Sequence, residues 1–121
     1  MTKAVRGAIQ VEVNTRQAIE EASVRLIREI LGANGIAENH IVSIVFSITE
    51  DLTAANPATG LRQVGFADTA LFCAQEPRID GSLPRVVRAL VTFESLERRE
   101  TVPVYLDGAR VLRPDLGGGR N

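Results

Sequence analysis

Several residue types that define whole classes of protein chemistry are nearly absent from this sequence. Its 121 residues include one cysteine, Cys73, one histidine, His40, and no tryptophan. A lone cysteine cannot form an internal disulfide, and a lone histidine cannot build a histidine-rich metal site. Glu50 and Asp51 are adjacent acids, but they project in different directions and lack further ligands. We therefore expect neither a disulfide nor a metal site.

An excess of charge of one sign is also missing. Fourteen basic residues face fifteen acidic ones, and only four phenylalanines and one tyrosine could stack on bases. Nucleic-acid binding needs a basic field and aromatic platforms, so we expect no nucleic-acid partner. No apolar run approaches the roughly 20 residues that span a bilayer, and the first residues lack the apolar core of a secretion signal. These absences favour a cytoplasmic protein without a membrane segment.

Arginine, by contrast, is abundant, because Lys3 is the one basic residue that is not arginine. The planar guanidinium binds carboxylates through two parallel hydrogen bonds, so this bias is compatible with an anionic ligand. A general coding preference for arginine over lysine explains it equally well. The bias alone therefore assigns no function.

Apolar periodicity places the strands. Alternation of apolar and polar residues predicts strands over 4–13 and 85–94, and short apolar runs predict strands over 71–75 and 104–106. The β-branched run 41–49 shows little alternation, which predicts a strand covered on both faces.

Helical spacing and capping residues place one long helix. Asn14 is the expected N-cap, with Gln17 as its capping-box partner, and the apolar stripe runs to about Leu31. Gly32 and Gly35 are expected to end this helix.

A second, short helix and a hairpin complete the pattern. Asn56 precedes Pro57, a favourable first helical residue, and Gly65 follows the expected end of the helix. Asp107-Gly108, between 104–106 and 109–112, is the sequence typical of a two-residue hairpin turn.

These elements predict one domain over residues 1–116 and a flexible glycine-rich tail over 117–121. The expected fold is α/β (α+β), a mixed sheet of roughly five strands packed with two helices. So few helices leave apolar sheet surface uncovered, so we expect the chain to form an oligomer.

Charged residues on the predicted strands are the clearest candidates for a site. Arg6 and Arg88 each interrupt an apolar strand, and Glu76 follows the strand that carries Cys73. An unpaired charge on a sheet must face water, a partner or a ligand. At any single position a solvated or salt-bridged side chain is the simpler interpretation. Lone His40 gives no Ser-His-Asp arrangement, and no glycine-rich phosphate loop is present.

Seven motifs carry a resemblance to a known family. They are Val5-Arg6-Gly7-Ala8, Ile48-Thr49-Glu50-Asp51-Leu52-Thr53, Pro57-Ala58 followed by Arg62, Cys73-Ala74-Gln75-Glu76, Gly81-Ser82-Leu83-Pro84-Arg85-Val86-Val87-Arg88, Val104-Tyr105-Leu106 and Val111-Leu112-Arg113-Pro114-Asp115-Leu116. In this order and approximate spacing, the chain resembles the trimeric α/β chorismate mutases, the class distinct from the all-helical one.

The resemblance implies a homotrimer with a pseudo-barrel core and clefts between adjacent subunits. It also implies conversion of chorismate to prephenate in phenylalanine and tyrosine biosynthesis. In this Claisen rearrangement an ether C–O bond breaks as a C–C bond forms, so no proton transfer, covalent intermediate or cofactor is required. The enzyme holds a dianion in a compact conformer and stabilises charge in the transition state.

The resemblance also implies a role for eight residues. Arg88 matches the arginine that faces the ether oxygen and a carboxylate, and Arg6 matches the arginine that binds the side-chain carboxylate. Glu76 matches the carboxylate that accepts from the ring hydroxyl, so Arg88, Glu76 and Arg6 are the expected catalytic residues. The remaining matches are expected to bind substrate: Tyr105 at the side-chain carboxylate, Cys73 as a pocket thiol, Arg62 and Arg113 at the cleft mouth, and Leu112 as an apolar wall.

Five positions in this pattern need particular explanation. Cys73 and Glu76 are three residues apart, so a regular strand would point them to opposite faces unless the chain bulges near Ala74. Without the resemblance, Cys73 is a typical small core residue and Tyr105 a typical packing residue. Asn56 and Gly60 replace an aromatic residue and a lysine that the family often carries, so we expect a more polar, less complete cover.

Two other functions are compatible with a strand-borne arginine in a small oligomer. One is a trimeric hydrolase of enamines or imines, which would release ammonia and leave chorismate unchanged. The other is a non-catalytic paralogue that binds chorismate or related metabolites without forming prephenate.

Overall fold

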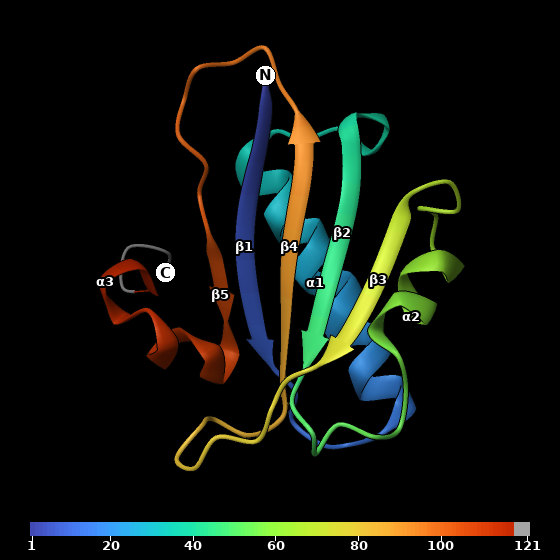
Figure 1. Cartoon of the computed structure of the whole chain (residues 1–121), viewed down its shortest axis with the longest axis vertical. Coiled ribbons are helices and arrows are strands. Elements are labelled where there is room, and N and C mark those ends of the chain that lie inside the picture. The colour runs from blue at the N-terminus through green and yellow to red at the C-terminus, as the bar shows by residue number, and fades with distance from the viewer. Residues whose placement is uncertain (118–121) are drawn as a thin grey trace.

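A five-stranded mixed sheet forms the framework of the chain, and the computed structural model describes residues 1–117. The strands lie in the order β3-β2-β4-β1-β5, with β1 and β2 both antiparallel to the central β4 and with β5 and β3 parallel to them at the edges (Figure 1). The expected α/β fold is therefore confirmed. The strand bounds are β1 Thr2–Gln10, β2 Ile41–Ile48, β3 Ala70–Gln75, β4 Val86–Glu94 and β5 Val104–Leu106.

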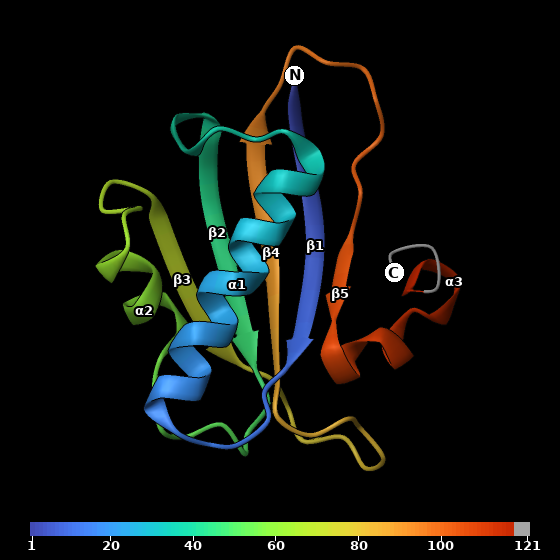
Figure 2. The ribbon, with the colours of Figure 1, turned by 180° about the vertical axis from the view of Figure 1, so that it is seen from behind.

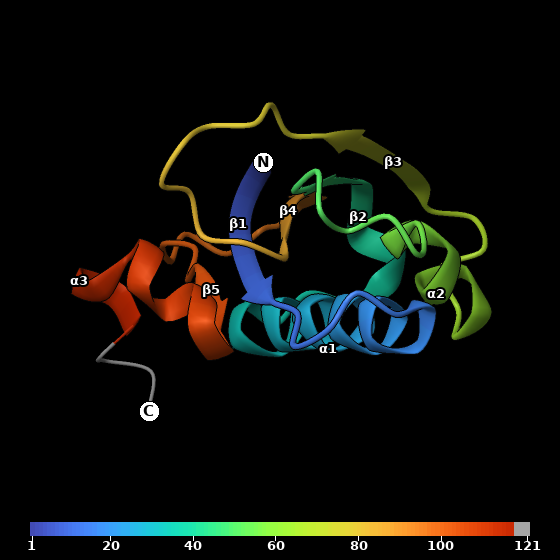
Figure 3. The same ribbon diagram turned by 90° about the horizontal axis from the view of Figure 1, so that it is seen from below.

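One long helix covers one face of this sheet. Helix α1, Arg16–Asn34, lies behind the strands in Figure 1 and in front of them in Figure 2, and no helix of residues 1–117 covers the opposite face (Figure 3). Short helices lie at the two edges, α2 (Pro57–Gln63) beside β3 and α3 (Pro114–Gly117) beyond β5. The 3₁₀ turns are η1, Glu38–His40, and η2, Asp107–Leu112. Of the predicted tail 117–121, residues 118–121 lie outside the described residues, and Gly117 is the last residue of α3.

Alternation along the strands separates a buried face from an open one. The side chains that face α1 are fully buried, among them Ile44, Phe46 and Val91, and they pack on apolar residues of α1. On the open face Val45 and Leu90 are 39% and 40% exposed. Strand β2 is thus covered on one face of the single chain, whereas the sequence predicted two. Its open face carries Ser43, Val45 and Ser47, so only one of these three side chains is apolar.

The long helix begins one residue later than predicted and ends three residues beyond the predicted Leu31. Its N-cap is Thr15, whose hydroxyl accepts a hydrogen bond from Ala18 N at 3.2 Å, and not Asn14. The Asn14 side-chain oxygen Oδ1 instead accepts from two backbone N–H groups of the loop after β2, those of Thr53 and Ala54. Because that tertiary contact occupies the side chain, the neighbouring threonine takes the capping role.

The glycines at the end of α1 behave differently. Gly35 adopts the left-handed conformation, with φ of 61°, and its N–H bonds to the Leu31 carbonyl, as predicted for a C-cap. Gly32 lies inside the helix and does not end it. At the second helix, Asn56 accepts a hydrogen bond from Ala58 N at 2.9 Å, and Pro57 is the first residue, as predicted.

The predicted hairpin after β5 does not form. Strand β5 pairs in parallel with β1, and the chain continues into η2. Asp107 has φ of 54°, but Gly108 is not among the residues with positive φ, so the two-residue hairpin geometry is absent. The Asp107 carboxylate accepts from Arg25 Nη1 of α1 at 2.9 Å, so its tertiary partner lies on the helix.

Two glycines permit close packing of neighbouring elements. A Cβ at Gly7 of β1 would lie 2.7 Å from both Ile30 Cδ1 of α1 and the Val104 carbonyl of β5. A Cβ at Gly60 of α2 would lie 2.8 Å from Glu20 Cβ of α1. The close approach of Glu20 explains a glycine at position 60 by the packing of α2 against α1. The sequence instead predicted Gly60 to be part of a substrate cover.

We expect Gly7→Ala to lower the free energy of unfolding by about 1–3 kcal/mol, because the added methyl group overpacks the contact between β1, β5 and α1. Urea denaturation checks the change. Gly32→Ala is the matched control, since no atom lies within 4 Å of its Cβ position and alanine favours a helix by about 0.5–1 kcal/mol. Equal stability of Gly7→Ala and the unmodified chain would contradict the packing assigned to Gly7.

Candidate active site

Four of the predicted site residues, Arg6, Arg88, Tyr105 and Glu76, lie on or beside the open face of the sheet, where laterally paired residues form two adjacent rows. One row runs Phe72–Val45–Leu90–Arg6, and the next runs Ala74–Ser47–Arg88–Ala8–Tyr105. Paired residues on neighbouring strands point to the same face. A hollow of about 430 Å³ lies over both rows, lined by the side chains of Arg6, Val45, Ser47, Arg88, Leu90 and Tyr105.

Arg88 and Glu76 form an ion pair at one side of this hollow. Arg88 Nε donates to Glu76 Oε2 at 3.0 Å, and Ser47 Oγ donates to the same oxygen at 2.6 Å. The Arg88 side chain is 41% exposed and the Glu76 side chain 22%, so water partly screens the pair. The Nη groups of Arg88 have no hydrogen-bond acceptor among residues 1–117, which leaves them available to an anionic ligand.

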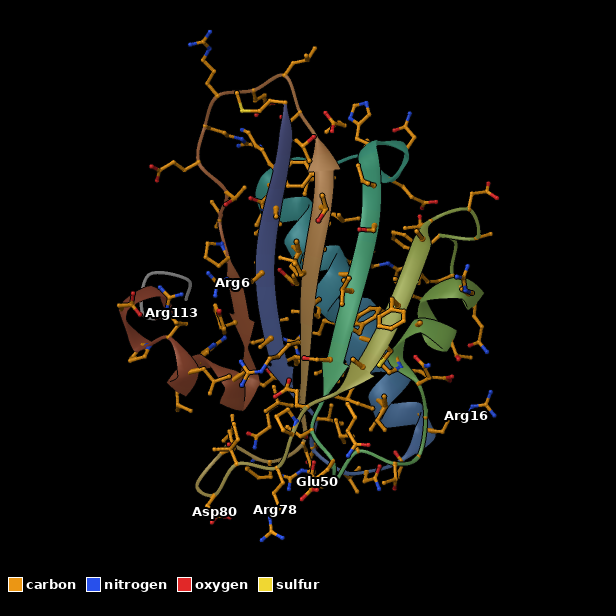
Figure 4. All side chains as sticks on the ribbon, in the orientation of Figure 1. Arg6, Arg16, Glu50, Arg78, Asp80 and Arg113 are labelled. Carbon is orange, nitrogen blue, oxygen red and sulfur yellow. The ribbon has the colours of Figure 1, made fainter. Side chains whose placement is uncertain are left out.

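Arg6 is the second cation of the hollow. It is exposed, and it makes no hydrogen bond or ion pair with the residues that the structure describes. Its paired residue in the row is Leu90, so the aliphatic part of the Arg6 side chain lies beside an apolar side chain. Figure 4 shows Arg6 beside β1 on the side of β5, with Arg113 farther out on that side. A guanidinium without a protein partner beside a hollow favours binding of a carboxylate.

Tyr105 closes the β5 side of the hollow. It is 5% exposed and packs in a small apolar cluster with Ala8, Val86 and Ala109, against which Leu112 also packs. Tyr105 thus has the packing role that its position alone suggested, and it also lines the hollow.

Arg113 stands next to this cluster at the start of α3. Its guanidinium pairs with Asp115, with Nη2 3.2 Å from Oδ2. The hydrogen bond to Asp115 is the largest influence that raises the pKa of Arg113, and the Tyr105 side chain adds a smaller contribution. Arg113 is therefore a permanent cation beside Tyr105.

The structure does not bring Cys73 or Arg62 to the hollow of the same chain. Strand β3 pairs regularly with β2 up to Gln75, without the bulge that would turn Cys73 toward the face of Glu76. Cys73 instead packs against the core on the buried face of the sheet, and burial raises the pKa of its thiol. Arg62 of α2 donates from Nη1 to the Ala67 carbonyl at 3.2 Å, beyond the β3 edge.

The segment after β2 fixes the start of β4. Arg85 has φ of 52°, and its N–H donates to both oxygens of Asp51, at 3.0 and 3.1 Å. Thr49 Oγ1 accepts from Val86 N at 3.0 Å and donates to Asp51 at 2.6 Å. Asp51 thus accepts from the Arg85 backbone N–H and from the Thr49 hydroxyl. No group of three His, Cys, Asp or Glu side chains suited to a metal occurs within residues 1–117.

A second hollow of about 330 Å³ lies under the loop between β3 and β4. Glu76 and Arg88 line it together with the loop residues. Arg78 lies at its rim, with Nε 3.7 Å from Glu50 and 3.9 Å from Asp80, and Figure 4 shows the three side chains at this end of the sheet. Arg88 therefore borders both hollows.

Sequence reasoning missed Ser47, Val45 and Leu90, which all line the hollow. Their signal was present in the alternation of β2 and β4, since Val45 and Ser47 share a face, as do Arg88 and Leu90. This alternation was overlooked because residues 41–49 were interpreted as a strand covered on both faces.

The open face thus defines a class of protein before any comparison. It is a small α/β domain whose site offers arginines with free donors, a carboxylate held by one of them and an apolar wall. No nucleophile–base pair occurs in this group of side chains. Such a site suits binding of an anionic molecule through its carboxylates.

Comparisons with known proteins identify the family. The family model of chorismate mutase type I matches residues 2–116. A chorismate mutase of Thermus thermophilus is 42% identical over 118 residues, which cover 96% of this chain and 97% of that protein. A chorismate mutase of Bacillus subtilis (strain 168) is 31% identical, covering 100% of this chain and 97% of that protein.

A solved structure agrees with these matches. The chain superposes on a chorismate mutase from Clostridium thermocellum with a TM-score of 0.86 and 37% identity, covering 90% of this chain and 98% of the other. The chain therefore belongs to the type I chorismate mutase family, whose members are isomerases. These findings do not support the enamine or imine hydrolase or the non-catalytic paralogue. No helix within residues 1–117 is long and apolar enough to cross a membrane.

We expect the Cys73 thiol to ionise at a higher pH than a free cysteine, because burial disfavours the thiolate. The rate of its reaction with a disulfide reagent, followed against pH, reports the thiolate fraction. The unfolded chain in guanidinium is the control and should titrate in the ordinary range. A midpoint in the folded protein at or below that of the unfolded chain would contradict the packing of Cys73 on the buried face of the sheet.

Proposed function

We propose that the chain binds chorismate in the hollow on the open face and converts it to prephenate, with Arg88, Glu76 and Arg6 as its catalytic residues. The observation that carries this proposal is the common position of Arg6, Arg88 and Tyr105 around one hollow, with Glu76 bound to Arg88. Two guanidinium groups with free donors match the two carboxylates of the substrate.

The rearrangement needs no group that donates or removes a proton. As the ether C–O bond breaks and the new C–C bond forms, negative charge grows on the ether oxygen. The unpaired Nη groups of Arg88 suit that oxygen and a neighbouring carboxylate, because donors fixed before the reaction cost no reorganisation during it. Glu76 is oriented by two hydrogen bonds, and it accepts a further hydrogen bond from the ring hydroxyl of the substrate.

The remaining side chains hold the substrate in a compact conformer. Arg6, without a protein partner, binds the side-chain carboxylate together with Tyr105. Leu112 forms an apolar wall through its contact with the Tyr105 cluster, and Arg113 places a cation at the mouth. Holding both ends of the reacting chain close lowers the entropic part of the barrier.

Several of the predicted site residues lie toward opposite edges of one chain, on either side of Arg88 on the central strand β4. Arg6, Tyr105 and Arg113 lie at the β1–β5 side, whereas Cys73 and Arg62 lie at the β3–α2 side. We propose that the β3–α2 edge of one copy completes the site on the β1–β5 side of the next. Contacts between two different edges close into a ring, and the family resemblance favours a ring of three.

The open face supports the same assembly. Phe72 is 65% exposed and, with Val45 and Leu90, forms an apolar row across three strands. Covering this row with other copies would remove its apolar surface from water. We also place the protein in the cytoplasm, since its one cysteine forms no internal disulfide and suits a reducing compartment.

Incubation of the purified chain with chorismate, following substrate loss and prephenate appearance, tests the activity directly. We expect Arg88→Lys to lower kcat by about 10²–10³-fold, because an ammonium cannot reproduce the fork that faces Glu76 and the developing charge. Arg113→Lys is the control and should mainly raise KM, since Arg113 lies at the mouth.

Two outcomes would contradict these assignments separately. Absence of prephenate above the uncatalysed background at high enzyme concentration would overturn the proposed activity. Equal losses of kcat in the Arg88 and Arg113 variants would leave the activity intact and overturn the role given to Arg88.

We expect Phe72→Glu to dissociate the assembly and to lower activity, because a carboxylate in an apolar contact is costly to bury. Sedimentation velocity measures the mass, and prephenate formation is measured at the same concentration. Ala33→Glu, on the exposed side of α1, is the control and should change neither. An unmodified chain that is fully active as a monomer would contradict the shared site.

A further inference from the structure

One carboxylate oxygen in the site accepts two hydrogen bonds while its twin accepts none. Glu76 Oε2 accepts from Arg88 Nε at 3.0 Å and from Ser47 Oγ at 2.6 Å. Glu76 Oε1 has no donor among residues 1–117. The carboxylate is thus bound to Arg88 through a single contact, although an arginine and a carboxylate commonly form two parallel bonds.

Ser47 occupies the position that explains this arrangement. It is paired across the sheet with Arg88 on β4 and with Ala74 on β3, so it stands between the strand of the arginine and the segment that carries Glu76. Its side chain lines the hollow and is partly buried. A serine hydroxyl has one proton to donate, and here that proton is given to Glu76.

We propose that Ser47 is a positioning residue that keeps Glu76 singly bound to Arg88. By holding Oε2, the hydroxyl stops the carboxylate from rotating into the two-bond pair in which Oε1 would take an Nη donor of Arg88. Oε1 then stays available to a substrate hydroxyl, and the Nη groups stay available to the oxygen that gains charge. This inference rests on the proposed function of the site, and it adds a residue whose effect passes through Glu76.

The test is the turnover of chorismate by Ser47→Ala. Loss of a hydrogen bond to a charged group in the transition state typically lowers a rate constant by about tenfold or more. We expect kcat to fall about tenfold with a smaller change in KM, because the free donors of Arg88 act chiefly in the transition state. Ser47→Thr keeps the hydroxyl and should restore most of the turnover. Ser43→Ala is the matched control, since Ser43 lies on the same strand and face but outside the hollow.

A double-variant cycle separates positioning from a general structural effect. In a Glu76→Ala background, Ser47→Ala should lower kcat by less than about twofold, because the group on which Ser47 acts is gone. If Ser47→Ala does not fold, as judged by circular dichroism, the near-isosteric Ser47→Cys takes its place, since a thiol is a weak donor.

Each outcome has one meaning. A Ser47→Ala or Ser47→Cys enzyme with unmodified kcat overturns the inference, and so does a loss that is equally large with and without Glu76. A loss confined to the background that contains Glu76 supports it. A wild-type chain that forms no prephenate overturns the proposed function instead, so the two failures are distinguishable.

Discussion

The antiparallel register of β4 with its two neighbours is the constraint on which the site depends. That register puts Arg88 directly between Ser47 of β2 and Ala8 of β1, and it puts Leu90 beside Arg6. A slip of one residue would turn Arg88 toward α1 and bury a charge in the core, at a large cost in free energy. The start of the strand is held accordingly, by Asp51 and Thr49 at the left-handed Arg85.

The ion pair between Arg88 and Glu76 contributes to orientation more than to stability. Both side chains are partly exposed, and such pairs contribute at most about 1 kcal/mol to folding. The buried face supplies the stability, through the close contact of α1 with β1, β4 and β5. The open face is therefore free to hold charged groups for a ligand, because the fold does not rely on them.

Local patterns predicted a large part of this arrangement. Alternation located the strands that carry Arg6 and Arg88, and the capping sequence located α2, because both signals depend on residues close in the chain. The pairing of β5 with β1 was not accessible, since Asp107-Gly108 is compatible with a hairpin and with the start of η2, and the contact with Arg25 decides between them. The Asn14 side chain likewise caps a distant loop, which only the tertiary structure shows.

The candidate site shows the same division between local and long-range information. The family resemblance gave the identity of the side chains, but not that several of them lie toward opposite edges of one protomer. Cys73 illustrates the limit: its side chain follows the regular pleat of β3 and packs on the buried face of the sheet, so sequence proximity to Glu76 is not spatial proximity. Ser47 shows the converse, because no motif singled it out and only the cross-strand pairing placed it beside Glu76.

Gly60, which allows α2 to pack closely against α1, restricts which substitutions the protein can accept during evolution. Any side chain at position 60 would push against the backbone of Glu20 and shift α2, and Arg62 would move with it. Under the proposed assembly, this displacement would change the position of Arg62 in the site of the adjoining copy. Substitution of Gly60, which is remote from the reacting atoms, would thus weaken substrate affinity. Selection for substrate binding would therefore also conserve the contact between α1 and α2.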